Sequence, residues 1–247
     1  MALEIQLLKA SYYKESDVDG ILKVCKQIET RYGGLINEVC SSGNGNLETY
    51  LLIGLYYIES QGNPSAQNGN AIGIGQIEPA SASNIAYWLN TKAKIMTDNQ
   101  KKMLVKLFGQ KTADCMLGLK WDNSPSPCSG GYIDSKTKQL TGPSSTNLVT
   151  KADLLDPVKN IWLSSMFLDY LIWMYSTGST LITAPTGVRM DRVITHYNAG
   201  QGNAKKLPKT ANAVDTLAYV RKNISPITSD YILKYIGVNG LIDILTR

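Results

Sequence analysis

Apolar residues recur at helical spacing along most of the chain and predict a mainly α protein. Between Val18 and Arg31 they form one stripe of an amphipathic helix, at Ile21, Leu22, Cys25 and Ile28, and we expect the pair Gly33–Gly34 to end it. The same spacing predicts further helices at about 98–107, 157–175, 189–198, 211–224 and 229–246. No strand-rich segment or internal repeat competes with this interpretation.

The predicted helix from Leu47 to Ser60 differs from the others. It follows a turn-rich segment whose last residue, Asn46, is suited to an N-cap, and its residues 51–58 form an unbroken apolar run. A helix that is apolar on all sides is expected to be buried. Glu59 follows directly, where burial and the negative end of the helix dipole both favour a protonated carboxyl. Such a group can donate a proton near neutral pH, although an exposed glutamate at a helix end fits these residues equally well.

Two segments are expected to lie outside regular helices. Residues 61–79 are rich in Gly and Asn and predict a loop with a short hairpin at about 71–77. From about 97 to 150 a Lys-rich helical piece is followed by a region dense in Gly, Ser, Pro and Thr. Irregular segments of this length inside a domain are uncommon, so we interpret it as an insertion that acts as a lid or docking element.

Composition narrows the class of protein. The chain has 247 residues, is 43% hydrophobic, and has a net charge of +5 with a pI near 8.9, which is typical of a soluble globular protein. The positive residues are scattered, so a solvated surface and attraction to a polyanion both stay open. Residues 1–9 lack the pattern of a secretory signal, and no apolar run approaches the roughly 20 residues of a transmembrane helix.

The cysteines and the single histidine, His196, give no metal-ligand spacing, so neither a metal nor a cofactor is expected. Cys25 could pair with Cys40, and Cys115 with Cys128, but free buried thiols are an equal alternative.

Short motifs around Glu59 carry a family resemblance. Glu59–Ser60 is followed by Asn63–Ala66, by Gly73–Gln76 and by Pro79–Ala80. This order resembles the lytic transglycosylases of the goose-lysozyme-like superfamily, whose signature is a catalytic Glu-Ser pair at a helix end, a Pro-x-Ala turn, a Gly-Leu-Met-Gln segment and a Pro-x-(Ser/Thr)-Ala segment. Gly75 stands where the family has methionine and removes a side chain that would normally line the cleft.

The resemblance continues downstream. Leu155–Ile161 matches the family's Asp-Pro-x-x-Asn-Ile helix start, His196–Gly202 matches Ala-Tyr-Asn-Ala-Gly with His196 in place of alanine, and Tyr219–Val220 matches a late Tyr-Val. Motifs in this order, across about 46–100 and 154–224, are more specific than any one of them. The resemblance implies a mainly α, lysozyme-like (goose-type/transglycosylase) helical domain with a small β-hairpin region and an irregular insertion. It implies a catalytic domain at 46–247, with the insertion at about 97–150, and an N-terminal helical segment at 1–45.

The matched motifs imply a set of site residues. Glu59 would be the single catalytic acid/base, and the residues expected to contact substrate are Ser60, Gln76, Tyr197, Asn198 and Tyr219. The resemblance places Gln76 in the cleft and points Tyr219 at the catalytic carboxyl. From the residues alone, Tyr197 could bind a carboxylate or sugar and Asn198 an N-acetyl group, or the two could be a buried tyrosine and an ordinary helix cap. We expect His196 to be a partly buried packing residue or a residue at the rim of the site, rather than a base.

The implied activity is cleavage of the bond between N-acetylmuramic acid and N-acetylglucosamine in bacterial peptidoglycan, with formation of 1,6-anhydromuramic ends. The expected partners are peptidoglycan glycan strands and phage tail or virion proteins, with no nucleic acid. Action on the cell wall from a virion, or after release from the cytoplasm as an endolysin, fits the lack of a signal. A secreted enzyme whose signal has been removed would look similar. One alternative is a goose-type lysozyme, a hydrolase that would need Glu78 or Asp191 to hold a water. Another is an inactive wall-binding virion module.

Overall fold

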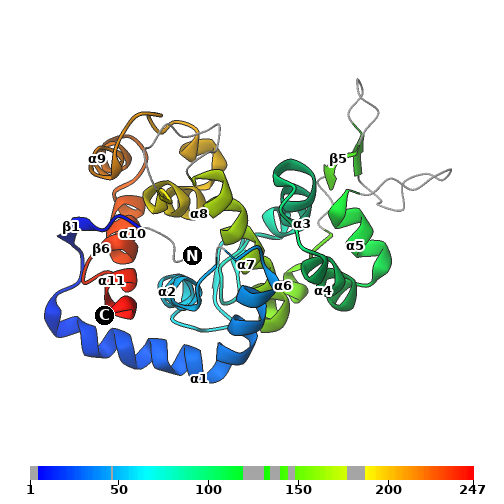
Figure 1. Ribbon diagram of the computed structural model, residues 1–247, viewed down its shortest axis with the longest axis horizontal. Helices are drawn as coiled ribbons and strands as arrows, with labels where there is room; N and C mark the ends of the chain where they lie inside the picture. Colours follow the sequence, from blue (N-terminus) through cyan, green and yellow to red (C-terminus); the bar gives the residue numbers. More distant parts are fainter. Residues whose placement is uncertain (1–4, 46, 119–130, 134–139, 144–147, 177–186) are drawn as a thin grey trace. The chain divides into compact units, whose positions relative to one another are not determined.

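A computed structural model describes residues 5–45, 47–118, 131–133, 140–143, 148–176 and 187–247, and these residues are mainly helical (Figure 1). The chain divides into two compact units. Unit 1 is formed by residues 1–34, 46–62 and 171–247, and unit 2 by residues 35–45 and 63–170. Two helices, α1 (Val18–Ser42) and α7 (Pro157–Met174), run from one unit into the other.

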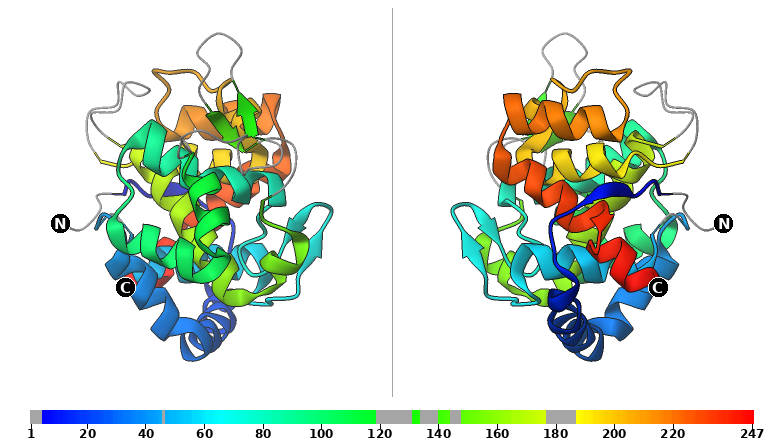
Figure 2. Two further views of the ribbon diagram at one scale, coloured as in Figure 1. Left: turned by 90° about the vertical axis from the view of Figure 1, so that its right-hand side faces the viewer. Right: turned by 90° about the vertical axis from the view of Figure 1, so that its left-hand side faces the viewer.

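Unit 1 is built around α10. This helix (Pro226–Ile236) packs against α2 (Thr49–Ser60), α8 (Met190–Ala204), α9 (Ala213–Asn223) and α11 (Leu241–Thr246). A two-stranded parallel sheet joins β1 (Leu8–Ser11) to β6 (Gly237–Val238), so the first strand lies beside the C-terminal part of the chain (Figure 2). A short 3-10 turn at Glu15–Asp17 leads into α1. The sequence pattern did not predict this sheet.

Unit 2 holds the remaining elements. They are the antiparallel hairpins β2–β3 (Gln67–Asn68, Ala71–Ile72) and β4–β5 (Gly131–Ile133, Leu140–Pro143), a π-helical turn η2 (Trp88–Ala93), and the helices α3 (Pro79–Tyr87), α4 (Asp98–Phe108), α5 (Gln110–Leu117) and α6 (Lys151–Leu155). The predicted hairpin is present and is extended by a bridge between Ile72 and Ile77. The expected helix start at Pro157 is confirmed.

Helix α1 does not end at Gly33–Gly34 as the sequence predicted, but continues to Ser42. Ile36 and Val39 continue the apolar stripe beyond the two glycines, and both are buried. Burial of these side chains outweighs the helix penalty of about 1 kcal/mol for each glycine. The N-cap of α2 also differs, because Glu48 takes that position instead of Asn46, which lies outside the described residues.

We expect Gly34→Ala to raise the free energy of unfolding by about 0.5–1 kcal/mol, because a Cβ there would meet nothing within 4 Å in the middle of a helix. Chemical denaturation measures the change. As a control, Gly62→Ala should destabilise, because Gly62 has a φ of +75° and its Cβ would lie 2.5 Å from Ile28 Cγ1. A loss of stability in Gly34→Ala would contradict this account.

The predicted last helix, 229–246, is broken in the structure. Helix α10 begins earlier, at Pro226, and Gly237–Val238 forms β6 before α11 begins. A Cβ at Gly237 would lie 2.6 Å from the backbone oxygens of Ala10 and Leu233. The close approach of β1 therefore breaks the single helix that the apolar periodicity suggested.

The predicted insertion contains ordered, buried structure. Helix α5 packs against α3 and α4, and its last five residues, Ala113–Leu117, are buried. After the undescribed residues that follow, Val149 is buried and its N–H donates to Ser83 Oγ at 3.0 Å. The portion 98–117 therefore belongs to the core of unit 2, and replacing residues 109–150 with a linker would expose it.

Candidate active site

Glu59 lies in the last turn of α2, a helix whose residues Leu51–Tyr56 are all buried. The helix stops directly after it. Gln61 adopts a left-handed conformation and its N–H donates to the carbonyls of Tyr56 and Tyr57, after which Gly62 turns the chain away at φ +75°. The apolar run therefore holds the end of α2 firmly in unit 1 and places the glutamate at a fixed point.

The pKa of the Glu59 carboxyl is raised from 4.5 to about 8. Burial is the main cause, and the Tyr231 hydroxyl lowers the pKa by a smaller amount as a donor. The residue is nevertheless only half-buried, so part of its surface stays accessible. A carboxyl that is protonated at neutral pH is suited to proton donation.

Tyrosines from three helices surround this carboxyl. Tyr56 lies on α2, Tyr197 on α8, and Tyr231 and Tyr235 on α10. Burial raises the pKa of Tyr197, Tyr231 and Tyr235 well above 10, and the negative charge of ionised Glu59 raises each of them further. The four tyrosines, here called the tyrosine cluster, keep the Glu59 site neutral and poorly hydrated.

Tyr231 makes the closest link to Glu59. Its hydroxyl is buried and completes no hydrogen bond of standard geometry with the described residues, yet it lies near enough to Glu59 to lower the carboxyl pKa. We interpret the contact as a long or bent hydrogen bond. Tyr231 and Tyr235 are four residues apart on α10 and so share one face of it. That spacing was visible in the sequence, but it did not indicate which tyrosine meets the carboxyl.

Tyr219, which the resemblance pointed at the carboxyl, lies on α9. It is half-buried, and its carbonyl accepts a hydrogen bond from Asn223 Nδ2. The tyrosine hydroxyl that acts on the Glu59 pKa is that of Tyr231 on α10. The packing of α10 on α2 brings Tyr231 to the carboxyl.

Tyr197 and Asn198 occupy the end of the regular part of α8. The helix is kinked at Gly200, which has φ 77° and ψ 167°, at the glycine where the sequence predicted its end. Tyr197 is turned toward Glu59, as the electrostatic effect of Glu59 on its hydroxyl shows. Asn198 is exposed, and its Oδ1 accepts a hydrogen bond of 2.9 Å from Thr228 on α10.

The side chains of Ser60 and Gln76 donate hydrogen bonds to nearby backbone carbonyls. Ser60 Oγ donates to the Tyr56 carbonyl at 3.2 Å, within its own helix. Gln76 belongs to unit 2, and its Nε2 donates to the carbonyls of Ala66 and Gly73 at 3.0 and 2.8 Å. It is also held at φ +46°, a strained conformation for a residue with a side chain. The Gln76 amide nitrogen therefore shapes the hairpin loop.

Gly75 is packed against α7 in unit 2. Its N–H donates to Asn160 Oδ1 at 2.9 Å, and a Cβ would lie 2.6 Å from Ser164 Cβ. The position therefore has no room for the methionine of the family pattern. Asn160 is fully buried and also donates from Nδ2 to the carbonyls of Ile72 and Leu154 at 2.8 and 2.9 Å. This asparagine fastens the end of β3, the turn that follows it and the end of α6 to α7.

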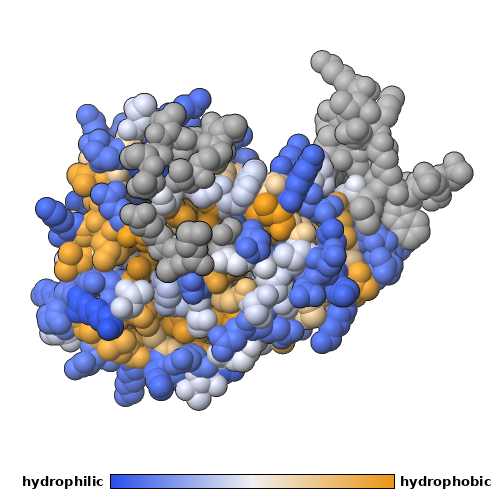
Figure 3. Space-filling view, in the orientation of Figure 1, coloured by the Kyte–Doolittle hydropathy of each residue, from blue (hydrophilic) through white to orange (hydrophobic). Residues whose placement is uncertain are grey.

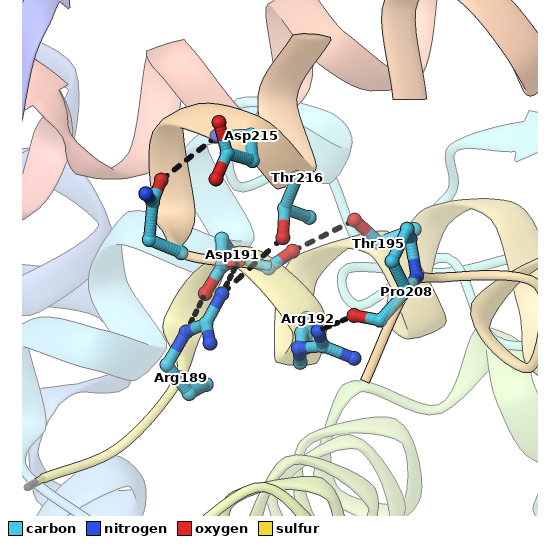
Figure 4. A network of polar contacts seen from close by, with 8 residues as sticks. Arg189, Asp191, Arg192, Thr195, Pro208, Asp215 and Thr216 are labelled. Atoms are coloured by element: carbon cyan, nitrogen blue, oxygen red, sulfur yellow. Dashed lines mark hydrogen bonds and ion pairs between the residues drawn. The ribbon is translucent and has the colours of Figure 1, made fainter. Parts of the chain in front are cut away.

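Asp191 is one candidate for holding a water, and both of its carboxylate oxygens are hydrogen-bonded within the protein (Figure 4). Its two carboxylate oxygens accept hydrogen bonds of 2.9 and 2.6 Å from Arg189, which also donates to Thr216 on α9. Arg192 on the next turn donates to the Pro208 carbonyl. This network anchors the start of α8 and leaves Asp191 1% exposed, too enclosed to position a water. Glu78, the other candidate, is exposed at the start of α3 in unit 2.

A second carboxyl with a raised pKa lies elsewhere. Burial raises the pKa of Asp169 on α7 to about 7, against smaller lowering effects of Gln100 and Asn44. Asp169 is 0% exposed, whereas Glu59 keeps accessible surface. Of the two, only Glu59 can meet a substrate.

His196 and the cysteines are the remaining candidates from the sequence. His196 is buried, its Nδ1 lies 3.2 Å from the Tyr175 hydroxyl, and burial lowers its pKa to about 4, so it is a neutral packing residue at pH 7. Cys25 and Cys40 do not pair with each other, whereas Cys115 is disulfide-bonded; Cys128 lies outside the described residues.

Among the described residues there is no group of three or more His, Cys, Asp and Glu side chains placed to hold a metal. None of the helices in the described ranges is long and apolar enough to cross a membrane.

Comparison of the chain with models of known protein families and with curated protein sequences finds no match.

Proposed function

We propose that this protein is a peptidoglycan lytic transglycosylase with a lysozyme-like fold, in which Glu59 is the only catalytic acid/base. The observation that carries the proposal is the Glu59 carboxyl at the end of a buried helix, with a pKa near 8 and accessible surface. The family motifs around Glu59 and Tyr197 support it independently of the pKa. Ser60, Gln76, Tyr197 and Asn198 are the proposed substrate contacts.

In the proposed reaction, the Glu59 carboxyl gives its proton to the glycosidic oxygen as the bond from the muramyl anomeric carbon breaks. The 2-acetamido group stabilises the positive charge that develops at this carbon. The Glu59 carboxylate then removes the proton of the muramyl 6-hydroxyl, whose oxygen closes the 1,6-anhydro ring. The proton returns to Glu59, and no water is consumed.

The tyrosine cluster supports both halves of this cycle. A poorly hydrated carboxyl is a strong proton acceptor once it is ionised, and it returns readily to the protonated form. The Tyr231 hydroxyl can donate to the carboxylate while the proton is on the sugar, which limits the cost of the buried charge. Hydrolysis would need a second carboxylate beside the anomeric carbon. No acidic side chain is among the causes of the Glu59 shift, and Asp191 is bound to Arg189.

The products test the proposal. Digested peptidoglycan analysed by mass spectrometry should contain muropeptides that end in 1,6-anhydromuramic acid, lighter by one water than hydrolysis products. These ends should resist borohydride, because the anomeric carbon is locked in the ring. Reducing muramic ends as the main product would identify a hydrolase, and binding without any cleavage would identify a wall-binding module.

A further inference from the structure

A pocket of about 450 Å³ lies in unit 1, away from the tyrosine cluster. Its walls come from α1, from the start of α2 and from α11. Leu22, Ile53 and Leu245 supply apolar surface, and Lys26, Glu29 and Glu48 supply charge. In Figure 3 apolar and polar side chains are intermixed where α1 passes the C-terminal helix. The volume and the mixture of an apolar lining with a few polar groups are typical of small-ligand sites.

The pocket is distinct from the catalytic carboxyl but shares a helix with it. Tyr50 borders the pocket in the first turn of α2, and Glu59 lies in the last turn. At 1.5 Å per residue, the nine steps from Tyr50 to Glu59 correspond to about 14 Å along the helix. Because both positions belong to unit 1, α2 fixes the distance between them.

The charged groups of the pocket are available to a ligand. Lys26 Nζ and Glu29 Oε2 are 3.9 Å apart, and their side chains are 80% and 54% exposed, so they form at most a weak ion pair. Glu48 occupies the N-cap of α2, yet its side chain accepts no capping hydrogen bond, unlike Thr97, Thr150 and Asn212 at the starts of α4, α6 and α9. Burial and then the charge of Glu48 raise the pKa of Tyr50, which places the carboxylate beside the pocket wall.

We infer that this pocket binds a short peptide that carries a side-chain amine and a carboxylate. Glu29 and Glu48 bind the ammonium group, Lys26 binds the carboxylate, and the aliphatic chain packs on Leu22, Ile53 and Leu245. The inference rests on the proposed function, because peptides with these groups branch from the muramyl sugars of peptidoglycan. A three-residue peptide spans up to about 11 Å when extended, and the side chain of a lysine at its third position adds further reach from a sugar at Glu59.

Calorimetric titration of the full chain with the tripeptide L-Ala–D-Glu–L-Lys tests the assignment without any turnover. We expect saturable binding, and we expect Glu48→Gln to raise the Kd by about tenfold because one of the two carboxylates is lost. Acetylation of the lysine side-chain amine should weaken binding to a similar degree. Glu38→Gln is the matched control, since Glu38 is an exposed glutamate of α1 outside the pocket, and it should leave the Kd unchanged.

Absence of binding at about 1 mM tripeptide, or equal binding by Glu48→Gln and by the acetylated peptide, would overturn the assignment. Failure of the proposed function gives a different pattern. If the protein binds the tripeptide but does not cleave glycan, the pocket assignment stands and the transglycosylase proposal fails. If it cleaves glycan but does not bind the tripeptide, the transglycosylase proposal stands and the pocket assignment fails.

Discussion

Glu59→Gln should lower the rate of peptidoglycan cleavage by at least about 10³-fold, because glutamine keeps the shape of the side chain but can neither give nor take the proton. Release of soluble muropeptides from purified cell walls measures the rate. In the unmodified protein, activity should fall as the pH rises through about 8, where Glu59 loses the proton that it must donate. Retention of more than a few per cent of activity in Glu59→Gln would move the chemistry to another residue.

The same substitution should make the protein more stable above neutral pH. A carboxyl whose pKa rises from 4.5 to about 8 on folding contributes full stability only below about pH 4.5 and loses it as the pH rises through 8. Glutamine carries no such penalty, so the free energy of unfolding at pH 8 should increase by on the order of 2 kcal/mol, after allowance for the accessible part of Glu59. Higher stability with lost activity separates a catalytic defect from misfolding.

Glu78→Gln is the matched control for this experiment. Glu78 is also a glutamate of the motif region, but it is exposed at the start of α3. A transglycosylase with Glu59 as its only acid/base should keep its activity in this variant. Loss of activity with retained folding would instead favour the hydrolase, with Glu78 as the residue that holds the water.

Asn160→Ala should destabilise the protein by about 3–5 kcal/mol, the largest effect on stability that we expect from a single side chain. The asparagine is 0% exposed, and its amide joins three backbone groups, at Ile72, Leu154 and Gly75. Alanine would leave these buried groups without their partner, at about 1–3 kcal/mol for each group that water cannot reach. Chemical denaturation measures the difference.

A control separates this effect from the general loss of an asparagine. Asn84 Nδ2 donates only to the Ala80 carbonyl, one turn earlier on the surface of α3. Asn84→Ala should change the free energy of unfolding by less than about 0.5 kcal/mol, since alanine is the better helix former. If the two variants had similar stabilities, Asn160 would not be the fastening between α7 and the end of β3 with the turn that follows it.

Helices α2 and α1 show where a local sequence pattern predicts the structure and where it does not. The apolar run of residues 51–58 predicted a buried helix with Glu59 at its end, and the structure places both there, because a segment that is apolar on all sides has to be enclosed. Helix α1 did not follow its local signals. Its two glycines argue for an end, but burial of Ile36 and Val39 is worth more than the glycine penalty, and that burial depends on what packs against them.

The sequence by itself determined a mainly helical chain, the place of Glu59 at the end of a buried helix, and the kink of α8 at Gly200, since each depends on residues close together in the chain. Tertiary structure alone decided that Tyr231 meets the carboxyl, and that Asp191 is bound to Arg189. It also decided that β1 interrupts the C-terminal helix at Gly237. The physical reason is the same in each case: periodicity shows which face of a helix is buried, whereas the partner of that face comes from segments distant in sequence.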